Sequence, residues 1–181
     1  IIINNGKIMS KVISGVPAVQ SVGIYAEDFG QIINNSEINL GDQGIGLFGN
    51  YSSVKNSQTG TITIADQGVG EYVVFGSKME NDGKIQIGEK SIGLYAEDIS
   101  GAAVYPGVGK ENEIINTGEI YSDKSLNTGI YSVGLDVLSR SVILNTGAIN
   151  LTGNSNVGIL GERTDITNSG TITLGNGQIT S

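Results

Sequence analysis

The chain has 181 residues, a formal net charge of −8 and neither cysteine nor histidine. These values exclude disulfides, thiolate catalysis and zinc sites built from cysteine and histidine. The two arginines, Arg140 and Arg163, cannot form the basic stripe that nucleic-acid binding requires, and no run of about 20 apolar residues could form a membrane-spanning helix.

From these absences we expect no cofactor, no nucleic-acid partner and no direct insertion into a membrane. The apolar residues are mostly isoleucine, valine and leucine, and they occur with 28 glycines and only 2 prolines. Residues branched at Cβ suit a pleated buried surface, whereas the strong helix formers are sparse. The composition therefore favours an all-β fold.

Two short patterns alternate along the chain. The first is asparagine, a small or polar residue, usually glycine, any residue, and isoleucine, and it begins at Asn4, Asn34, Asn56, Asn81, Asn116, Asn145 and Asn168. The second is valine or isoleucine, glycine, and usually isoleucine or leucine, often followed by an aromatic residue. Its glycines are Gly23, Gly46, Gly70, Gly93, Gly134 and Gly158.

The spacing of the asparagines sets a period of 22 to 23 residues, as from Asn34 to Asn56 and from Asn145 to Asn168. Within a period, residues of alternating character such as Thr61 to Ile64 predict short strands, with glycine and asparagine at the corners because they reach left-handed backbone angles at least cost. A unit this small cannot bury its own apolar face and must stack on its neighbours. We predict a parallel β-helix of about seven coils of three short strands, with an isoleucine core and an asparagine amide ladder at one corner.

Longer spacings locate three insertions. The distances between motifs place excursions from the rod at 9–21, 97–113 and 122–132, and both prolines, Pro17 and Pro106, fall within them. Neither end of the chain offers a polar or helical cap. We therefore expect residues 1–181 to be a single β-helix segment of a longer array.

The alternation of the asparagine-glycine motif with Gly23-Ile24-Tyr25-Ala26 and Gly93-Leu94-Tyr95-Ala96 resembles the repeats of very large autotransporters, the type V secreted surface proteins of Gram-negative bacteria, especially the fusobacterial adhesins. The resemblance covers essentially the whole chain. It implies a right-handed parallel β-helix in a passenger domain, held at the cell surface by an outer-membrane anchor. It also implies a host or bacterial surface protein or glycan as partner, but no binding motif that can be carried over.

Two acidic pairs are candidate cation ligands, Glu27-Asp28 and Glu97-Asp98, each in a Tyr-Ala-Glu-Asp context. The pairs lie three coils apart, about 14 Å along the rod, which is too far for a glycosidase carboxyl pair. A solvated corner is the simpler interpretation, with a calcium site as the alternative.

Arg163 lies between Glu162 and Asp165, which invites comparison with the arginine base of β-helical polysaccharide lyases. Such sites need several cations and acids on one face, so a surface ion pair is the simpler interpretation. A threonine array of the ice-binding kind is equally disfavoured, because the threonines of 61–63 and 171–173 are separated by coils that carry other residues.

The best candidate for recognition is the long glycine-rich insertion at 97–113. Its apolar and aromatic residues are Val104, Tyr105, Pro106 and Val108. Loops on a rigid scaffold carry function disproportionately, and tyrosine is a favoured contact residue. We expect a non-catalytic surface segment that displays loops for attachment, with a pure spacer as the main alternative and a polysaccharide-acting enzyme as a weaker one.

Overall fold

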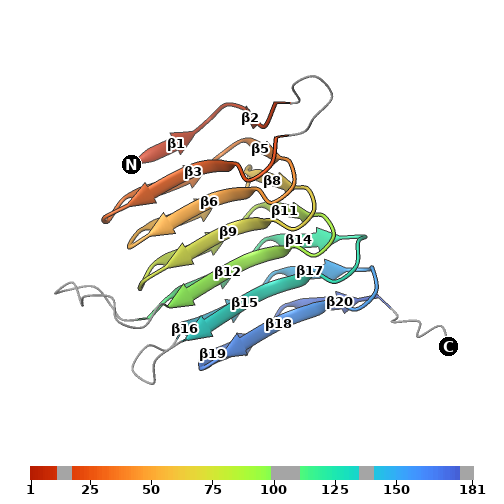
Figure 1. Ribbon diagram of the computed structural model, residues 1–181. Helices are drawn as coiled ribbons and strands as arrows, with labels where there is room; N and C mark the ends of the chain where they lie inside the picture. Colours follow the sequence, from red (N-terminus) through yellow and green to blue (C-terminus); the bar gives the residue numbers. More distant parts are fainter. Residues whose placement is uncertain (12–17, 99–110, 135–140, 176–181) are drawn as a thin grey trace.

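The computed structural model describes residues 1–11, 18–98, 111–134 and 141–175, and the elements in these ranges are strands joined by turns. The strands form three parallel sheets that run the length of a rod, and the chain passes from the first sheet to the second, to the third and back to the first (Figure 1). The predicted parallel β-helix of about seven coils with three short strands is therefore confirmed. No helix in the described ranges is long and apolar enough to span a membrane.

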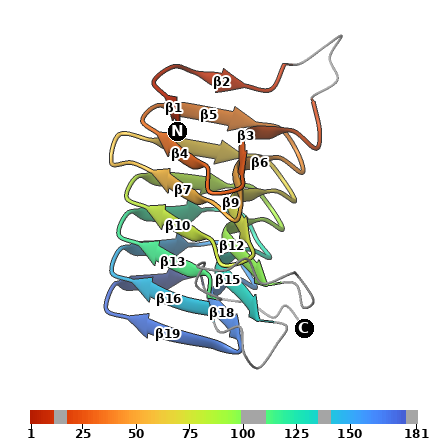
Figure 2. The same ribbon diagram turned by 90° about the vertical axis from the view of Figure 1, so that its left-hand side faces the viewer.

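Sheet 1 contains seven strands, seen side by side in Figure 2: β1 (Ile2–Asn4), β4 (Gln31–Asn34), β7 (Ser53–Asn56), β10 (Lys78–Asn81), β13 (Glu113–Asn116), β16 (Ser141–Asn145) and β19 (Thr164–Asn168). Sheet 2 also has seven: β2 (Ile8–Met9), β5 (Glu37–Leu40), β8 (Thr61–Ile64), β11 (Lys84–Ile87), β14 (Glu119–Ser122), β17 (Ala148–Leu151) and β20 (Thr171–Leu174). Sheet 3 has six: β3 (Val22–Glu27), β6 (Ile45–Asn50), β9 (Val69–Val74), β12 (Ile92–Asp98), β15 (Thr128–Gly134) and β18 (Val157–Glu162).

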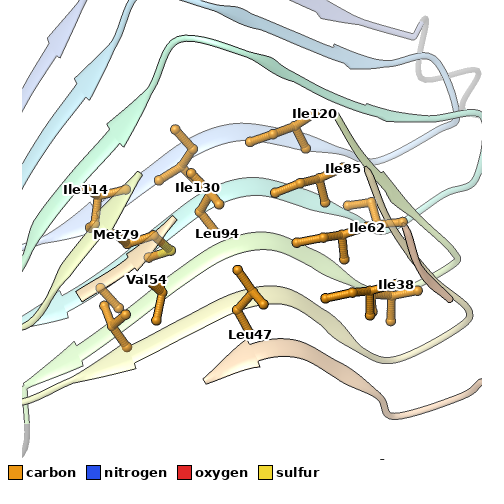
Figure 3. Close-up of a cluster of buried hydrophobic side chains, with 14 of the residues drawn as sticks. Ile38, Leu47, Val54, Ile62, Met79, Ile85, Leu94, Ile114, Ile120 and Ile130 are labelled. Atoms are coloured by element: carbon orange, nitrogen blue, oxygen red, sulfur yellow. The ribbon is translucent and has the colours of Figure 1, made fainter. Parts of the chain in front are cut away.

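The core consists of aliphatic side chains stacked in register from coil to coil. In sheet 2, Ile62 pairs with Ile85, which pairs with Ile120, and each of these side chains is at most 1% exposed. Sheet 1 and sheet 3 point their own rows toward the same interior, as the labelled side chains of Figure 3 show. Burying each of these side chains stabilises the fold by about 1.5–3 kcal/mol, a gain that exists only when coils stack.

An amide ladder closes the corner between sheets 1 and 2. The Nδ2 atom of each motif asparagine donates to the Oδ1 atom of the next at 2.6–2.9 Å, and the interior members are fully buried. Because a buried amide without partners costs about 1–3 kcal/mol, each asparagine satisfies its neighbours as well as itself. The ladder runs through Asn4, Asn34, Asn56, Asn81, Asn116, Asn145 and Asn168.

The recurrent glycines provide space and not left-handed backbone angles. A Cβ atom on Gly70 would lie 2.5 Å from the Gly93 carbonyl oxygen of the next coil and 2.6 Å from the Ile85 side chain. Among the described glycines only Gly76 has a positive φ angle. The turns from sheet 2 to sheet 3 instead place one non-glycine residue per coil at φ 56–63°, namely Gln20, Gln43, Gln67, Lys90, Leu126 and Ser155. The prediction that glycine and asparagine turn the corners through left-handed angles is thus wrong.

The fifth coil departs from the predicted alignment. Thr128 pairs with Ile92 on one side and Val157 on the other, so Gly129 stacks between Gly93 and Gly158, whereas Gly134 pairs with Asp98 at the end of β15. The assignment of Gly134 to the glycine row is therefore wrong, because threonine replaces the expected aliphatic residue before Gly129. The excursion placed at 122–132 is likewise corrected: 128–132 belongs to β15, and the surplus residues follow that strand.

The other two excursions lie between strands of consecutive sheets. Strands β2 and β3 leave residues 10–21 between them, and β12 and β13 leave residues 99–112. Both intervals contain residues outside the described ranges.

Candidate functional site

The outer face of sheet 3 differs from the other surfaces of the rod because its outward side chains form rows that are apolar in nearly every coil. In β9, Tyr72 points outward and Val73 inward, and the same alternation recurs in register along the sheet. One outward row, here named the aliphatic row, comprises Val22, Ile45, Val69, Ile92, Thr128 and Val157. The next, the aromatic row, comprises Tyr25, Phe48, Tyr72, Tyr95 and Tyr131, followed by Leu160.

The rings of the aromatic row stack on one another. Successive ring centroids from Phe48 to Tyr131 are 4.9, 4.9 and 5.3 Å apart, with planes within 20° of parallel, and Tyr25 continues the row with a tilted ring. These separations are close to the step between neighbouring parallel strands, about 4.8 Å. Because the ring faces contact each other, the row offers ring edges and hydroxyl groups to a partner.

A third row adds carboxylates beside the rings. Glu27, Glu97 and Glu162 occupy this carboxylate row, with Asn50, Val74 and Val133 at the other coils. The Tyr25 hydroxyl donates to Glu27 at 2.6 Å, and the Tyr72 hydroxyl donates to Glu97 at 2.8 Å.

These contacts hold the phenols in their neutral form. Burial, together with the Glu97 carboxylate, raises the pKa of Tyr95 to about 12, and the same two causes raise the pKa of Tyr72. The hydrogen bond to Glu27 is the main cause that raises the pKa of Tyr25. The tyrosines therefore act as permanent donors that fix the carboxylates in place at any physiological pH.

The charge on this face is entirely acidic. The described strands of sheet 3 contain glutamates and one aspartate but neither lysine nor arginine. By contrast, several carboxylates on or beside the other two sheets contact lysines: Lys55 lies 2.6 Å from both Glu80 and Asp82, and these contacts raise the pKa of Lys55 and lower that of Asp82. Within the described ranges, the ion pairs of the other two sheets have no counterpart at Glu27 or Glu97.

The two predicted acidic pairs lie at the ends of β3 and β12. Glu27 ends β3 and Asp28 begins the turn with φ 50°, while Glu97 lies in β12 and Asp98 pairs through its backbone with Gly134. Strands β6 and β9 separate the two pairs. Across the described part of the chain, no three acidic side chains gather as a metal site would require.

The remaining sequence candidates are dispersed. Arg163 occupies the turn after β18 with φ 52°. Thr61 is followed in its outward row by Lys84, Glu119 and Ala148 before Thr171. The recognition candidates Val104, Tyr105, Pro106 and Val108 lie outside the described residues.

Sequence reasoning missed the outward rows and one buried acid. The aromatic residues were visible in the second motif, but only the register shows that their rings form a single stack. Glu71 occupies the inward position held by Leu47 and Leu94 in adjacent coils, and it is fully buried with no hydrogen-bond partner for its carboxyl oxygens. Burial raises its pKa well above the usual range. The sequence does carry a signal for this buried acid, because Glu71 stands where the glycine motif usually has isoleucine or leucine.

Comparison with protein families gives a match over nearly the whole chain. The family model described as the BigA third pectate lyase-like domain matches residues 1–180. No curated protein and no solved structure matches the chain.

Proposed function

The chain belongs to the family of the BigA third pectate lyase-like domain, a β-helical domain of a bacterial surface protein, and from this premise we propose that it is a non-catalytic attachment segment. In this function a stiff rod presents one long face to a protein or glycan on a host or bacterial surface. Family membership supports surface display, and the face of sheet 3 supports attachment.

The continuous apolar face is the observation that carries the proposal. Its aliphatic and aromatic rows extend over six coils: the members in the first and last strands, such as Val22, Tyr25 and Leu160, are 41–45% exposed, and the members between them are partly exposed. Contiguous exposed apolar rows rimmed by polar groups mark interaction surfaces more often than they mark inert ones. Stacking in register makes the face rigid, so little ordering entropy opposes binding.

A spacer is the main alternative, because the same stacking would stiffen a stalk that binds nothing. A polysaccharide-acting enzyme would need cations and acids gathered in one place, whereas Arg163 and the acidic pairs lie in different turns and strands. We therefore retain the attachment function as the proposal and the spacer as its competitor.

Cell binding by the 181-residue chain separates these two functions. The double variant Ile45→Lys and Ile92→Lys places charges in the aliphatic row and should reduce adhesion to host or bacterial cells at least tenfold. The matched control, Thr63→Lys and Gln86→Lys, changes outward positions of sheet 2 by the same charge and should adhere normally. Equal thermal melts by circular dichroism would show that both variants fold.

The insertion after β12 is tested separately by deleting residues 99–110, which keeps both flanking strands. If the deletion abolishes adhesion and the lysine variants do not, the loop and not the sheet 3 face binds the partner. Absence of adhesion by the unaltered chain would favour the spacer.

We further propose that the protein is an adhesin tethered to the outer membrane of a Gram-negative bacterium. The resemblance of its repeats to autotransporter passenger domains, of the fusobacterial type in particular, supports this location. An antibody against the chain should label intact cells, and external protease should remove the label. Labelling only after cell lysis would contradict surface display.

A further inference from the structure

We propose that the outer face of sheet 3 docks a protein segment rich in lysine or arginine, laid along the rod with its cationic groups opposite the carboxylate row. This inference rests on the proposed attachment function and identifies the chemistry of the partner. It follows from the charge, the apolar surroundings and the spacing of one face.

The acidic groups of sheet 3 differ from those of the other two sheets in their partners. Glu37, Glu113 and Glu119, which lie on sheets 1 and 2, each have a lysine Nζ atom within 2.9–3.9 Å. On sheet 3, Glu27 and Glu97 instead accept hydrogen bonds from tyrosine hydroxyl groups, and neither forms an ion pair among the described residues. A cationic partner would supply the charge that the other sheets supply internally.

The surroundings of Glu27 and Glu97 favour a cationic side chain. Tyr25 and Tyr72 fix Glu27 and Glu97 by hydrogen bonds, so a partner finds acceptors already oriented. The aromatic and aliphatic rows lie beside them and match the apolar stems of lysine and arginine, which pack along such surfaces while their charged heads stay at the polar edge. Covering this face would lower the local dielectric and strengthen each ion pair.

Ring geometry favours a protein segment over a glycan. Sugars bind aromatic residues by stacking on exposed ring faces, but the faces from Phe48 to Tyr131 are occupied by neighbouring rings 4.9–5.3 Å away. A second copy of this chain is disfavoured as well, because its net charge of −8 would bring like charges together.

The spacing indicates an elongated partner. Glu27 and Glu97 lie three coils apart and Glu97 and Glu162 two coils apart, which corresponds to about 14 Å and about 10 Å along the rod. An extended chain covers these distances in roughly four and three residues. Several cations on one extended segment would therefore reach the whole row.

The test uses deca-lysine and deca-arginine as probes, with a neutral glycine-serine decapeptide for comparison, and measures their affinity for the 181-residue chain by calorimetry. The triple variant Glu27→Gln, Glu97→Gln and Glu162→Gln should lower the affinity about tenfold, as expected for three partly exposed ion pairs. Its matched control, Glu37→Gln, Glu113→Gln and Glu119→Gln, removes the same charge from sheets 1 and 2 and should change affinity less than threefold. Ile92→Ser should also weaken binding if the peptide stems contact the aliphatic row.

Equal losses in the two triple variants would overturn the inference, because they would show attraction to net charge and not to this face. Tight binding of a neutral glycan, or dimers in sedimentation, would overturn it in favour of those occupants. Normal adhesion of the sheet 3 triple variant to cells would overturn the basic partner while leaving attachment intact. Failure of the unaltered chain to adhere, with peptide binding as expected, would instead reject the attachment function.

Discussion

Glu71 is a buried glutamate at a position that leucine occupies in the two adjacent coils. Its neighbours in the row are Leu47 and Leu94, and its carboxyl group has no hydrogen-bond partner. Burial is the main cause that raises its pKa, with the nearby charges of Asp82 and Glu80 adding to it. The folded protein therefore keeps Glu71 protonated at pH values where the unfolded chain releases the proton.

This difference predicts how stability depends on pH. The unfolded pKa is about 4.3, so the folded state is favoured most below that value and loses stability as pH rises toward the folded pKa. Glu71→Leu should stabilise the fold by about 1–3 kcal/mol in acid and by more at pH 8. Urea unfolding from pH 4 to pH 9 measures both effects. An equal gain at every pH would mean that Glu71 is solvated in the folded state.

Gly70 tests the requirement for space between coils. Because a Cβ atom would meet a backbone carbonyl at 2.5 Å, Gly70→Ala should destabilise the fold by about 1–3 kcal/mol. Gly6 has no atom within 4 Å of its virtual Cβ, so Gly6→Ala should leave the melting temperature unchanged. Equal effects of the two substitutions would contradict close packing as the reason for the glycine row.

At the scale of a structural element, the asparagine ladder makes each coil depend on two others. Asn81 accepts from Asn56 and donates to Asn116, and all three are fully buried. Replacing Asn81 by leucine keeps the volume but leaves a donor and an acceptor without partners.

Asn81→Leu should therefore cost about 2–4 kcal/mol in the free energy of unfolding. Asn168→Leu is the control, because Asn168 is an exposed terminal member of the ladder and its loss should cost less than about 1 kcal/mol. Chemical denaturation of both variants provides the comparison. A small effect at Asn81 would show that water replaces the missing amide.

The sheets could be predicted from sequence because their periodicity is repeated. Each asparagine motif ends in an inward isoleucine, and aligning the seven copies predicts the register of sheets 1 and 2. The fifth copy of the glycine motif was misplaced because Thr128 is polar while Val133 fits the pattern, and only the contact between coils distinguishes Gly129 from Gly134.

The outer face of sheet 3 was less predictable, because its residues come from separate copies of the motif. Tyr25, Tyr72 and Tyr95 each belong to a different copy of the motif, and sequence alone does not state whether their rings stack or spread. The residues with positive φ angles could not be predicted from the sequence either, since glutamine and lysine are uncommon at φ near 57°. Stacking forces these angles in every coil, so tertiary structure overrides the local preference.

For the molecule as a whole, the free energy of unfolding is approximately the sum of a contribution from each coil and a contribution from each contact between neighbouring coils. A central coil contacts partners on both sides, whereas the last one has a neighbour on one side only among the described residues. A destabilising substitution in a central coil should therefore interrupt the stack of folded coils. A destabilising substitution in the last coil should unfold that coil and leave the others folded.

The pair Ile85→Asp and Ile172→Asp tests this picture. Ile85 is fully buried, so an uncompensated charge there should cost about 3–5 kcal/mol and abolish the cooperative melt of the segment. Ile172 occupies the equivalent position of the last coil but is 37% exposed, and its substitution should leave most of the transition intact. A cooperative melt of Ile85→Asp near the parent temperature would contradict the assignment of the core.

The asparagine ladder also gives the rod a direction. Every amide donates toward the C-terminal coil and accepts from the N-terminal one, so the side-chain dipoles from Asn4 to Asn168 add instead of cancelling. Like the aligned peptide groups of an α-helix, such a chain of bonds is polarised along its length. The two ends of the ladder consequently differ in polarity: the Asn4 end offers an amide oxygen and the Asn168 end offers amide hydrogens, so a coil that continues the ladder keeps the same orientation.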